Sequence, residues 1–103
     1  MSPVDPRQHI ALSHIGLALI ELGRFDEAIV AGKKALRQNP SYVATYHCLA
    51  SAFAHLGRDA EAHDAAARVL EIDPAFTISA LIARVPKNSN LFIEGLRKAG
   101  LPE

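Results

Sequence analysis

The sequence repeats itself at an interval of 34 residues, and this repeat restricts the possible folds more than any other feature. Segment 9–42 aligns with segment 43–76 without a gap, and nine positions are identical. The identical positions are Ala18/Ala52, Leu22/Leu56, Gly23/Gly57, Arg24/Arg58, Glu27/Glu61, Ala28/Ala62, Ala31/Ala65, Leu36/Leu70 and Pro40/Pro74. A fixed period of this length indicates stacked supersecondary units, each of which buries its apolar face against its neighbours.

Each unit is predicted to hold two antiparallel helices. The first helices are expected at 9–22 and 43–56, and the second helices at 25–38 and 59–72. Gly23 and Gly57 can adopt the left-handed conformation that ends a helix and reverses the chain. Pro40 and Pro74 end the second helices, because proline lacks the backbone N–H that a continuing helix needs. The repeat therefore predicts two helix pairs with matched turns and boundaries.

The composition favours an all-α fold and excludes several classes of partner. The chain has 18 Ala in 103 residues, only 6% aromatic residues and no Trp, which favours helices over strands. Eleven basic side chains balance eleven acidic ones, so neither nucleic acid nor a membrane surface is expected as a partner. Cys48 is the single cysteine and agrees with a reducing, cytoplasmic location. Neither a signal peptide nor a membrane span is expected.

The residues that recur in each unit resemble the tetratricopeptide repeat (TPR) pattern of alternating bulky and small positions. The first unit matches it at Leu12, Ile15, Gly16, Leu19, Gly23, Phe25, Ala28, Ala35 and Pro40. The second unit matches it at Tyr46, Leu49, Ala50, Phe53, Gly57, Ala62, Val69 and Pro74. The resemblance implies a right-handed α-solenoid, and the buried stripe is expected at Leu12/Tyr46, Ile15/Leu49, Leu19/Phe53 and Leu22/Leu56.

The rest of the chain is predicted to complete a domain of about six helices. Residues 1–8 are interpreted as a linker or an added N-terminal segment, and 9–103 as one TPR domain. In 77–103, a degenerate repeat with a helix at 77–85 is followed by a capping helix at 91–99. Ser89 or Asn90 is expected to cap the start of the last helix, and Gly100 its end. Phe92, Leu96 and Ala99 share its apolar face.

The last half of the chain also resembles the C-terminal region of bacterial multi-domain proteins that carry a class III adenylate/guanylate cyclase domain followed by TPR units. This resemblance is carried by segments 55–62, 73–83 and 92–103. It implies a parent enzyme whose catalytic domain lies upstream. No catalytic residue of such a cyclase can be assigned to these residues.

The candidate binding surface is the concave face that the first helices of a TPR stack would line. A stripe beside the expected core stripe recurs at spacings of three and four residues, and it continues into the third unit, where Ile82 joins it. The candidate groove residues are Ile10, Ser13, Leu17, Ile20, Ala44, His47, Ser51, Ala54, His55, Ile78 and Leu81. An apolar groove with imidazole side chains suits a peptide or helix, unless the upstream segment or a second copy covers it.

The sequence offers no pattern for catalysis, a cofactor or a metal. His9 and His14 are five residues apart and His47 and His55 eight apart, and neither spacing places the imidazoles on adjacent turns of a helix. Cys48 is interpreted as a packed or half-exposed thiol, because consecutive helical residues point about 100° apart, and adjacency to His47 does not by itself create a thiolate–imidazole couple. Phosphate-binding and nucleophile-elbow motifs are absent. The isolated chain is not expected to be an enzyme.

The TPR resemblance also allows one known ligand mode to be tested, in which Lys, Asn and Arg hold a C-terminal carboxylate. The corresponding positions hold only Ser13, Leu17, Cys48, Ile78 and Ile82, so this mode is not expected. The sequence therefore predicts a non-catalytic scaffold that binds a protein, a peptide or the upstream domain of its own chain. The alternative is self-association into a homodimer, which would dimerise the parent enzyme.

Overall fold

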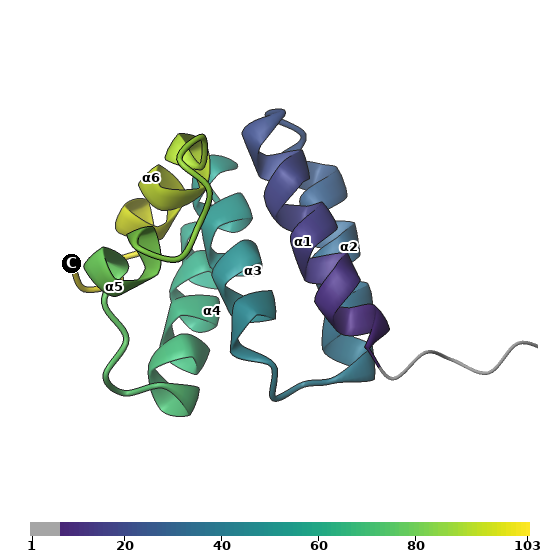
Figure 1. Cartoon of the computed structure of the whole chain (residues 1–103), viewed down its shortest axis with the longest axis horizontal. Coiled ribbons are helices and arrows are strands. Elements are labelled where there is room, and N and C mark those ends of the chain that lie inside the picture. The colour runs from purple at the N-terminus through teal and green to yellow at the C-terminus, as the bar shows by residue number, and fades with distance from the viewer. Residues whose placement is uncertain (1–6) are drawn as a thin grey trace, which may run out of the picture.

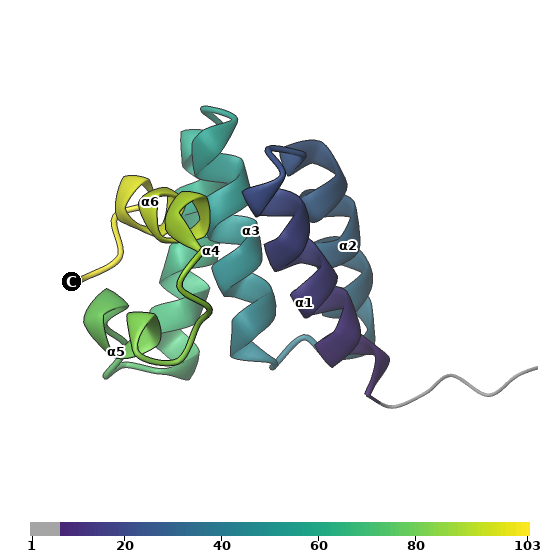
Figure 2. The ribbon, with the colours of Figure 1, turned by 45° about the horizontal axis from the view of Figure 1, so that its top comes forward.

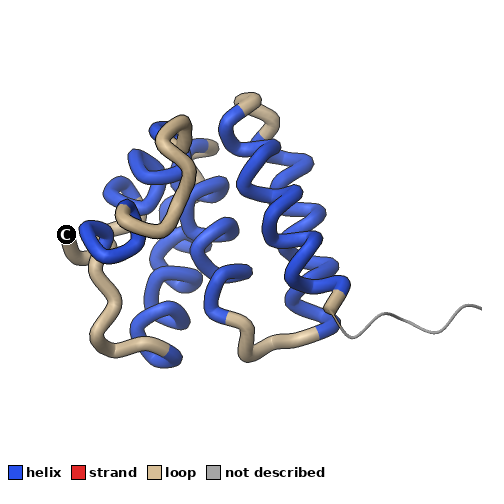
Figure 3. Tube along the Cα trace, in the orientation of Figure 1, coloured by secondary structure: helices blue, strands red, loops and turns tan. Residues whose placement is uncertain are grey.

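The structure is a computed structural model, and it describes residues 7–103. These residues form an all-α helical-repeat fold of six helices without strands (Figure 3). The helices are α1 (Gln8–Glu21), α2 (Phe25–Gln38), α3 (Val43–His55), α4 (Asp59–Ile72), α5 (Ile78–Ile82) and α6 (Asn90–Lys98). No helix in this part of the chain is long and apolar enough to cross a membrane.

The first four helices confirm the helices predicted from the repeat. α2 and α4 have the expected bounds, and α1 and α3 differ by one residue at their ends. Gly23 and Gly57 have φ angles of 74° and 73°. After α1, the N–H of Arg24 donates to Leu19 O at 2.8 Å and that of Gly23 donates to Ile20 O at 2.9 Å, which is the Schellman arrangement. The predicted glycine turns are therefore correct.

α3 is the central helix of the molecule. α1 pairs with α2 and α3 pairs with α4, while α2 packs on α3 and α1 lies beside it (Figure 1). Ten consecutive residues of α3, 45–54, are buried, because α1, α2, α4 and α6 pack around this helix. The Tyr46 hydroxyl donates to Pro40 O at 2.7 Å and holds the connection between the two repeats.

The predicted core stripe is confirmed at Tyr46, Leu49 and Phe53 of α3, whereas Leu56 is 37% exposed. Of the four positions predicted in the first unit, Leu12 and Leu19 are half-buried, and Ile15 and Leu22 are exposed. Leu49 is 5% exposed, whereas its repeat equivalent Ile15 is 50% exposed, and Leu22 is 68% exposed. The buried face of α1 is instead His9, Ser13, Gly16 and Ile20. The reason is that α2 covers the outer side of α3, whereas among the described residues no helix precedes α1.

The third unit is shorter than predicted, and its last helix does not extend the stack. α5 covers only five residues of the expected 77–85 helix. α6 packs mainly against α3 and also contacts α1 and α5 (Figure 2). The chain end returns to α5, where the N–H of Ile78 donates to Pro102 O at 2.8 Å. Gly100 has a φ of 91° and ends α6 as expected.

The division of the chain into a linker and a domain remains a prediction. The first six of residues 1–8 lie outside the described part of the chain, and Gln8 already belongs to α1.

Candidate functional site

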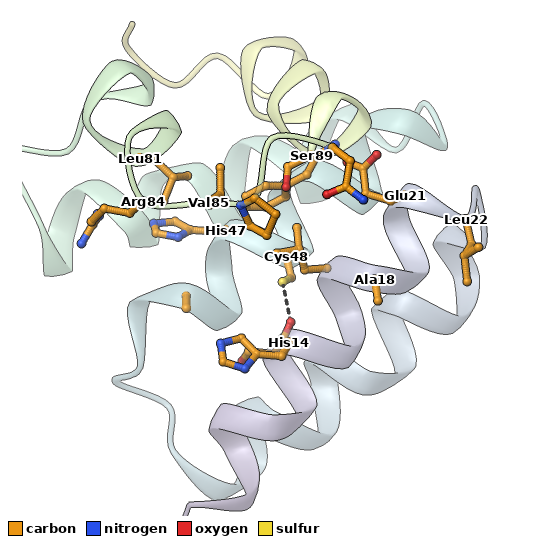
Figure 4. Close-up of a pocket in the computed structure, with 16 residues that line it drawn as sticks. His14, Ala18, Glu21, Leu22, His47, Cys48, Leu81, Arg84, Val85 and Ser89 are labelled. Carbon is orange, nitrogen blue, oxygen red and sulfur yellow. Dashed lines mark hydrogen bonds between the residues drawn. The ribbon is translucent and has the colours of Figure 1, made fainter.

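An open trough lies on the inner side of the molecule, with α1 on one side, the α5–α6 connection on the other and α3 as its floor (Figure 4). Its volume is about 910 Å³. More than half of the lining side chains are apolar. The lining residues are Ser13, His14, Leu17, Ala18, Glu21 and Leu22 from the α1 segment, Ala44, His47 and Cys48 from α3, and Leu81, Arg84, Val85, Pro86, Asn88, Ser89 and Phe92.

Five of the groove residues predicted from the sequence line this trough: Ser13, Leu17, Ala44, His47 and Leu81. The Ser13 hydroxyl already donates to His9 O at 2.9 Å and lies 3.1 Å from Thr45 Oγ1. Ser13 therefore connects α1 with α3, and the side chains available to a partner are mainly Leu17 and Ala44, which are half-buried.

The other six candidate groove residues, Ile10, Ile20, Ser51, Ala54, His55 and Ile78, do not line the trough. Ile10 is half-buried, whereas Ile20, Ser51 and Ile78 have no exposed surface. Ala54 is also buried, and the His55 ring stacks on Phe25 at 4.5 Å between ring centres. Ile20, Ser51, Ala54 and Ile78 are thus buried within the fold and offer no free surface to a partner.

α6 occupies the part of the inner face that the sequence assigned to a partner. The Ser51 hydroxyl donates to Phe92 O at 2.9 Å, and His55 Nε2 donates to Leu91 O at 2.6 Å. Both bonds hold the backbone of α6 rather than its side chains. The trough is what remains open beside this helix.

A carboxylate from the first helix holds the N-terminus of α6. Glu21 Oε1 accepts the Phe92 N–H at 2.8 Å, and Oε2 accepts the Leu91 N–H at 3.3 Å. A negative charge is favourable here, because the first N–H groups of a helix lack partners within the helix and carry partial positive charge. The predicted cap is thus corrected: Ser89 is at the N-cap position, but its side chain makes no capping bond.

Comparison with known proteins gives a match to the TPR repeat family model over residues 16–57. This segment runs from the buried Gly16 of α1 through α2 and α3 to the Gly57 turn. Residues 16–57 therefore belong to the tetratricopeptide repeat family.

Two relatives support the TPR assignment. The chain is 43% identical over 47 residues, 46% of its length, to the probable UDP-N-acetylglucosamine–peptide N-acetylglucosaminyltransferase SPINDLY of Solanum lycopersicum. It is 34% identical over 71 residues, 69% of its length, to the Protein STIP1 homolog of Dictyostelium discoideum. The matches span only 5% and 13% of those two proteins. No solved structure is a significant match.

The floor of the trough holds a neutral imidazole, that of His47. Burial lowers the pKa of His47 to about 4, and the positive charge of Arg84 adds to this effect, while Asp73 opposes it. Nε2 of His47 is buried without a hydrogen-bond partner, and the ring lies 4.9 Å from that of Phe76. At neutral pH the floor is therefore uncharged at this point.

The neighbouring thiol is packed and unreactive. Burial raises the pKa of Cys48 to about 12, and its Sγ donates to Ser13 O at 3.3 Å. Because the thiolate is the nucleophilic form, a thiol with this pKa has no catalytic use at neutral pH. Among residues 7–103, no group of three His, Cys, Asp or Glu side chains is placed to hold a metal ion.

The burial of His47 predicts a pH dependence of stability. The folded pKa of about 4 lies below the value of 6.5 in the unfolded chain, so the unfolded state binds more protons between these values and stability falls as the pH drops below 6.5. From pH 7 to pH 5 we expect a loss of about 2 kcal/mol. Urea unfolding of the wild type and of His47→Leu at both pH values measures this loss. An equal pH dependence in both proteins would contradict the prediction.

The groove predicted from the sequence lacks the trough residues that lie after α5, and it also lacks five earlier ones: His14, Ala18, Glu21, Leu22 and Cys48. The signal for Glu21 was present, because it is the only acidic or basic side chain between residues 8 and 21 apart from histidines. The sequence marks Glu21 as a lone carboxylate in an otherwise apolar helix, but it could not show that its partner is a helix about 70 residues away. No local feature of the sequence predicts that Arg84, Val85 and Pro86 fold back toward α1.

Proposed function

We propose that this chain is a non-catalytic protein-interaction domain, and that it binds a peptide or helix of another protein in the trough between α1 and the α5–α6 connection. The observation that carries the proposal is the open volume of about 910 Å³ beside α6, lined mainly by apolar side chains. Concave faces are the binding surfaces of helical-repeat proteins, and exposed apolar hollows mark interaction sites.

The trough indicates what the partner should present. Its apolar floor suits a large aliphatic or aromatic side chain as an anchor. Arg84 and His14 are exposed at its mouth, whereas the carboxylate of Glu21 is used by α6. We therefore expect an acidic residue beside the anchor, because complementary charge steers and orients a partner.

The experiment selects peptides from a phage-displayed random library with the complete chain as bait and measures their affinities by calorimetry. Ala44→Glu puts a charge into the apolar trough, and we expect it to weaken the selected peptides at least about tenfold. The variant should fold, because Ala44 is in the first turn of α3, where a carboxylate is favourable.

The matched control is Ala60→Glu, which is the same change at the same position of α4, on an exposed surface outside the trough. It should bind the peptides as the wild type does. If no peptide is enriched, or if Ala44→Glu and Ala60→Glu bind equally well, the trough is not the binding site.

A finer proposal concerns the parent protein. The resemblance of segments 55–62, 73–83 and 92–103 to the C-terminal region of bacterial cyclase proteins supports a cytoplasmic signalling enzyme as the parent. In that case the upstream domain of the same chain is the partner that occupies the trough. The full-length open reading frame tests this directly, and we expect no nucleotide cyclase activity from the isolated chain.

Self-association is the second candidate function. The observation that favours it is the exposure of Ile15 and Leu22 on α1. This surface is distinct from the floor of the trough.

A further inference from the structure

α1 presents an apolar stripe to solvent. Ala11, Ile15, Ala18 and Leu22 follow each other at spacings of four, three and four residues, and all four are exposed. No charged side chain interrupts the stripe. Spacings of this kind place side chains along one seam of a helix, which is the pattern by which two helices pack together.

The second repeat shows how the same stripe is used when it is covered. The equivalent positions are Thr45, Leu49 and Ala52 in α3, which are buried, and Leu56 just after its end, which is exposed. α2 lies on this side of α3 and approaches closely: a Cβ added at Gly32 would be 2.7 Å from Leu49 Cδ2. The stripe on α1 therefore continues a helix-packing surface that is already in use one repeat further along the chain.

The order of large and small residues makes the stripe complementary to itself. If two copies of α1 lie antiparallel about a two-fold axis midway along the stripe, Ala11 faces Leu22 and Ile15 faces Ala18 of the other copy. Every large side chain then meets a small one, and no like charges face each other. A surface that complements itself in this way is what an isologous dimer requires.

We propose that the chain forms a homodimer through antiparallel pairing of α1 with α1 of a second copy. A contact made by one helix pair is at the small end of specific interfaces, so the dimer should be weak and depend on concentration. Ala18 and Leu22 also line the edge of the trough, so dimerisation should bring two troughs together at the interface.

Sedimentation velocity of the full chain between about 1 μM and 1 mM tests the proposal. We expect the mass to rise from monomer to dimer over this range. Ile15→Ala leaves two small residues facing each other, and Ala18→Ile places two isoleucines in one position. Each variant should weaken the dimer about tenfold or more, through a packing defect in the first and overpacking in the second.

The decisive variant combines the two changes. Ile15→Ala with Ala18→Ile exchanges large and small positions, so each isoleucine again faces an alanine and dimerisation should return toward the wild-type level. Val30→Ala is the control, because Val30 is an exposed apolar residue of α2, and it should not change the mass. A monomer at about 1 mM, or a double variant weaker than both single variants, would overturn the proposal.

The outcome is separable from that of the trough experiment. Ile15 does not line the trough and Ala44 does not belong to the stripe. Ala44→Glu should therefore dimerise normally, and Ile15→Ala should bind the selected peptides normally. An Ile15→Ala variant that loses peptide binding but keeps its dimer would overturn the proposed pairing.

Discussion

Ile20→Ala is expected to destabilise the domain by about 3 kcal/mol, within the range of roughly 2–5 kcal/mol for an aliphatic side chain truncated in a core. Ile20 has no exposed surface and belongs to the main apolar cluster. Its removal leaves a cavity on the buried face of α1. Because the free energy of unfolding of a domain is about 5–15 kcal/mol in total, this loss would remove a substantial part of its stability.

The matched control is Ile15→Ala, the same change five residues earlier in the same helix. Ile15 is half exposed, so this variant should lie within about 0.5 kcal/mol of the wild type. Urea unfolding at low protein concentration measures both variants, with an unchanged slope indicating intact two-state unfolding. Equal losses would mean that the buried face of α1 is not the one described.

Gly95→Ala is the second variant with a large expected effect. An added Cβ would be 2.8 Å from both the Cα and the O of Ser51, and the backbone of α3 cannot move away as a flexible side chain could. α6 would have to lift from α3. Although alanine favours a helix over glycine by about 1 kcal/mol, we expect a net loss of about 2–3 kcal/mol from overpacking.

Gly16→Ala is the control that measures the higher helix propensity of alanine over glycine without a steric clash. A Cβ at Gly16 would lie 3.6 Å from Cys48 Sγ and 3.7 Å from Ala28 O, which is ordinary contact. This variant should therefore be stabilised by up to about 1 kcal/mol. Hydrogen exchange of the Leu91 and Phe92 amides locates the damage in Gly95→Ala, where both should exchange faster. Unchanged exchange and stability would contradict the close packing of α6.

The Gly95→Ala variant also tests how α6 and the trough divide the inner face of α3 between them. α6 takes the half of this face that contains Ser51 and His55, and the trough takes the half that contains Ala44 and His47. A partner in the trough would therefore lie next to the N-terminus of α6. Variants that loosen α6 should be checked for peptide binding as well as for stability.

Much of the fold could be predicted from the sequence, because its signals are local. Gly23 and Gly57 have the positive φ angles that their positions required, and α2 and α4 end before Pro40 and Pro74 as expected. Ser13, His47 and Leu81 of the candidate groove occupy the same position of the repeat, and all three line the trough, because the repeat period projects this position onto one side of successive first helices.

The faces of α1 could not be predicted in the same way. Ile15 and Leu49 occupy the same position of the repeat, yet one is exposed and the other buried. Periodicity assigns both to the core because it treats every unit as if it had neighbours on both sides. Burial depends on whether a neighbour exists, and only the arrangement of whole helices shows that.

The sequence by itself determined the repeat, the four long helices, their turns and their apolar character, because propensity, glycine turns and proline boundaries act over a few residues. Only the tertiary structure decided that α6 lies on α3, that Glu21 holds its N-terminus, and that Ile20 rather than Ile15 belongs to the core. These features depend on contacts between residues far apart in the chain. Gly95 shows the reason, because its missing side chain matters only once Ser51 of another helix lies against it.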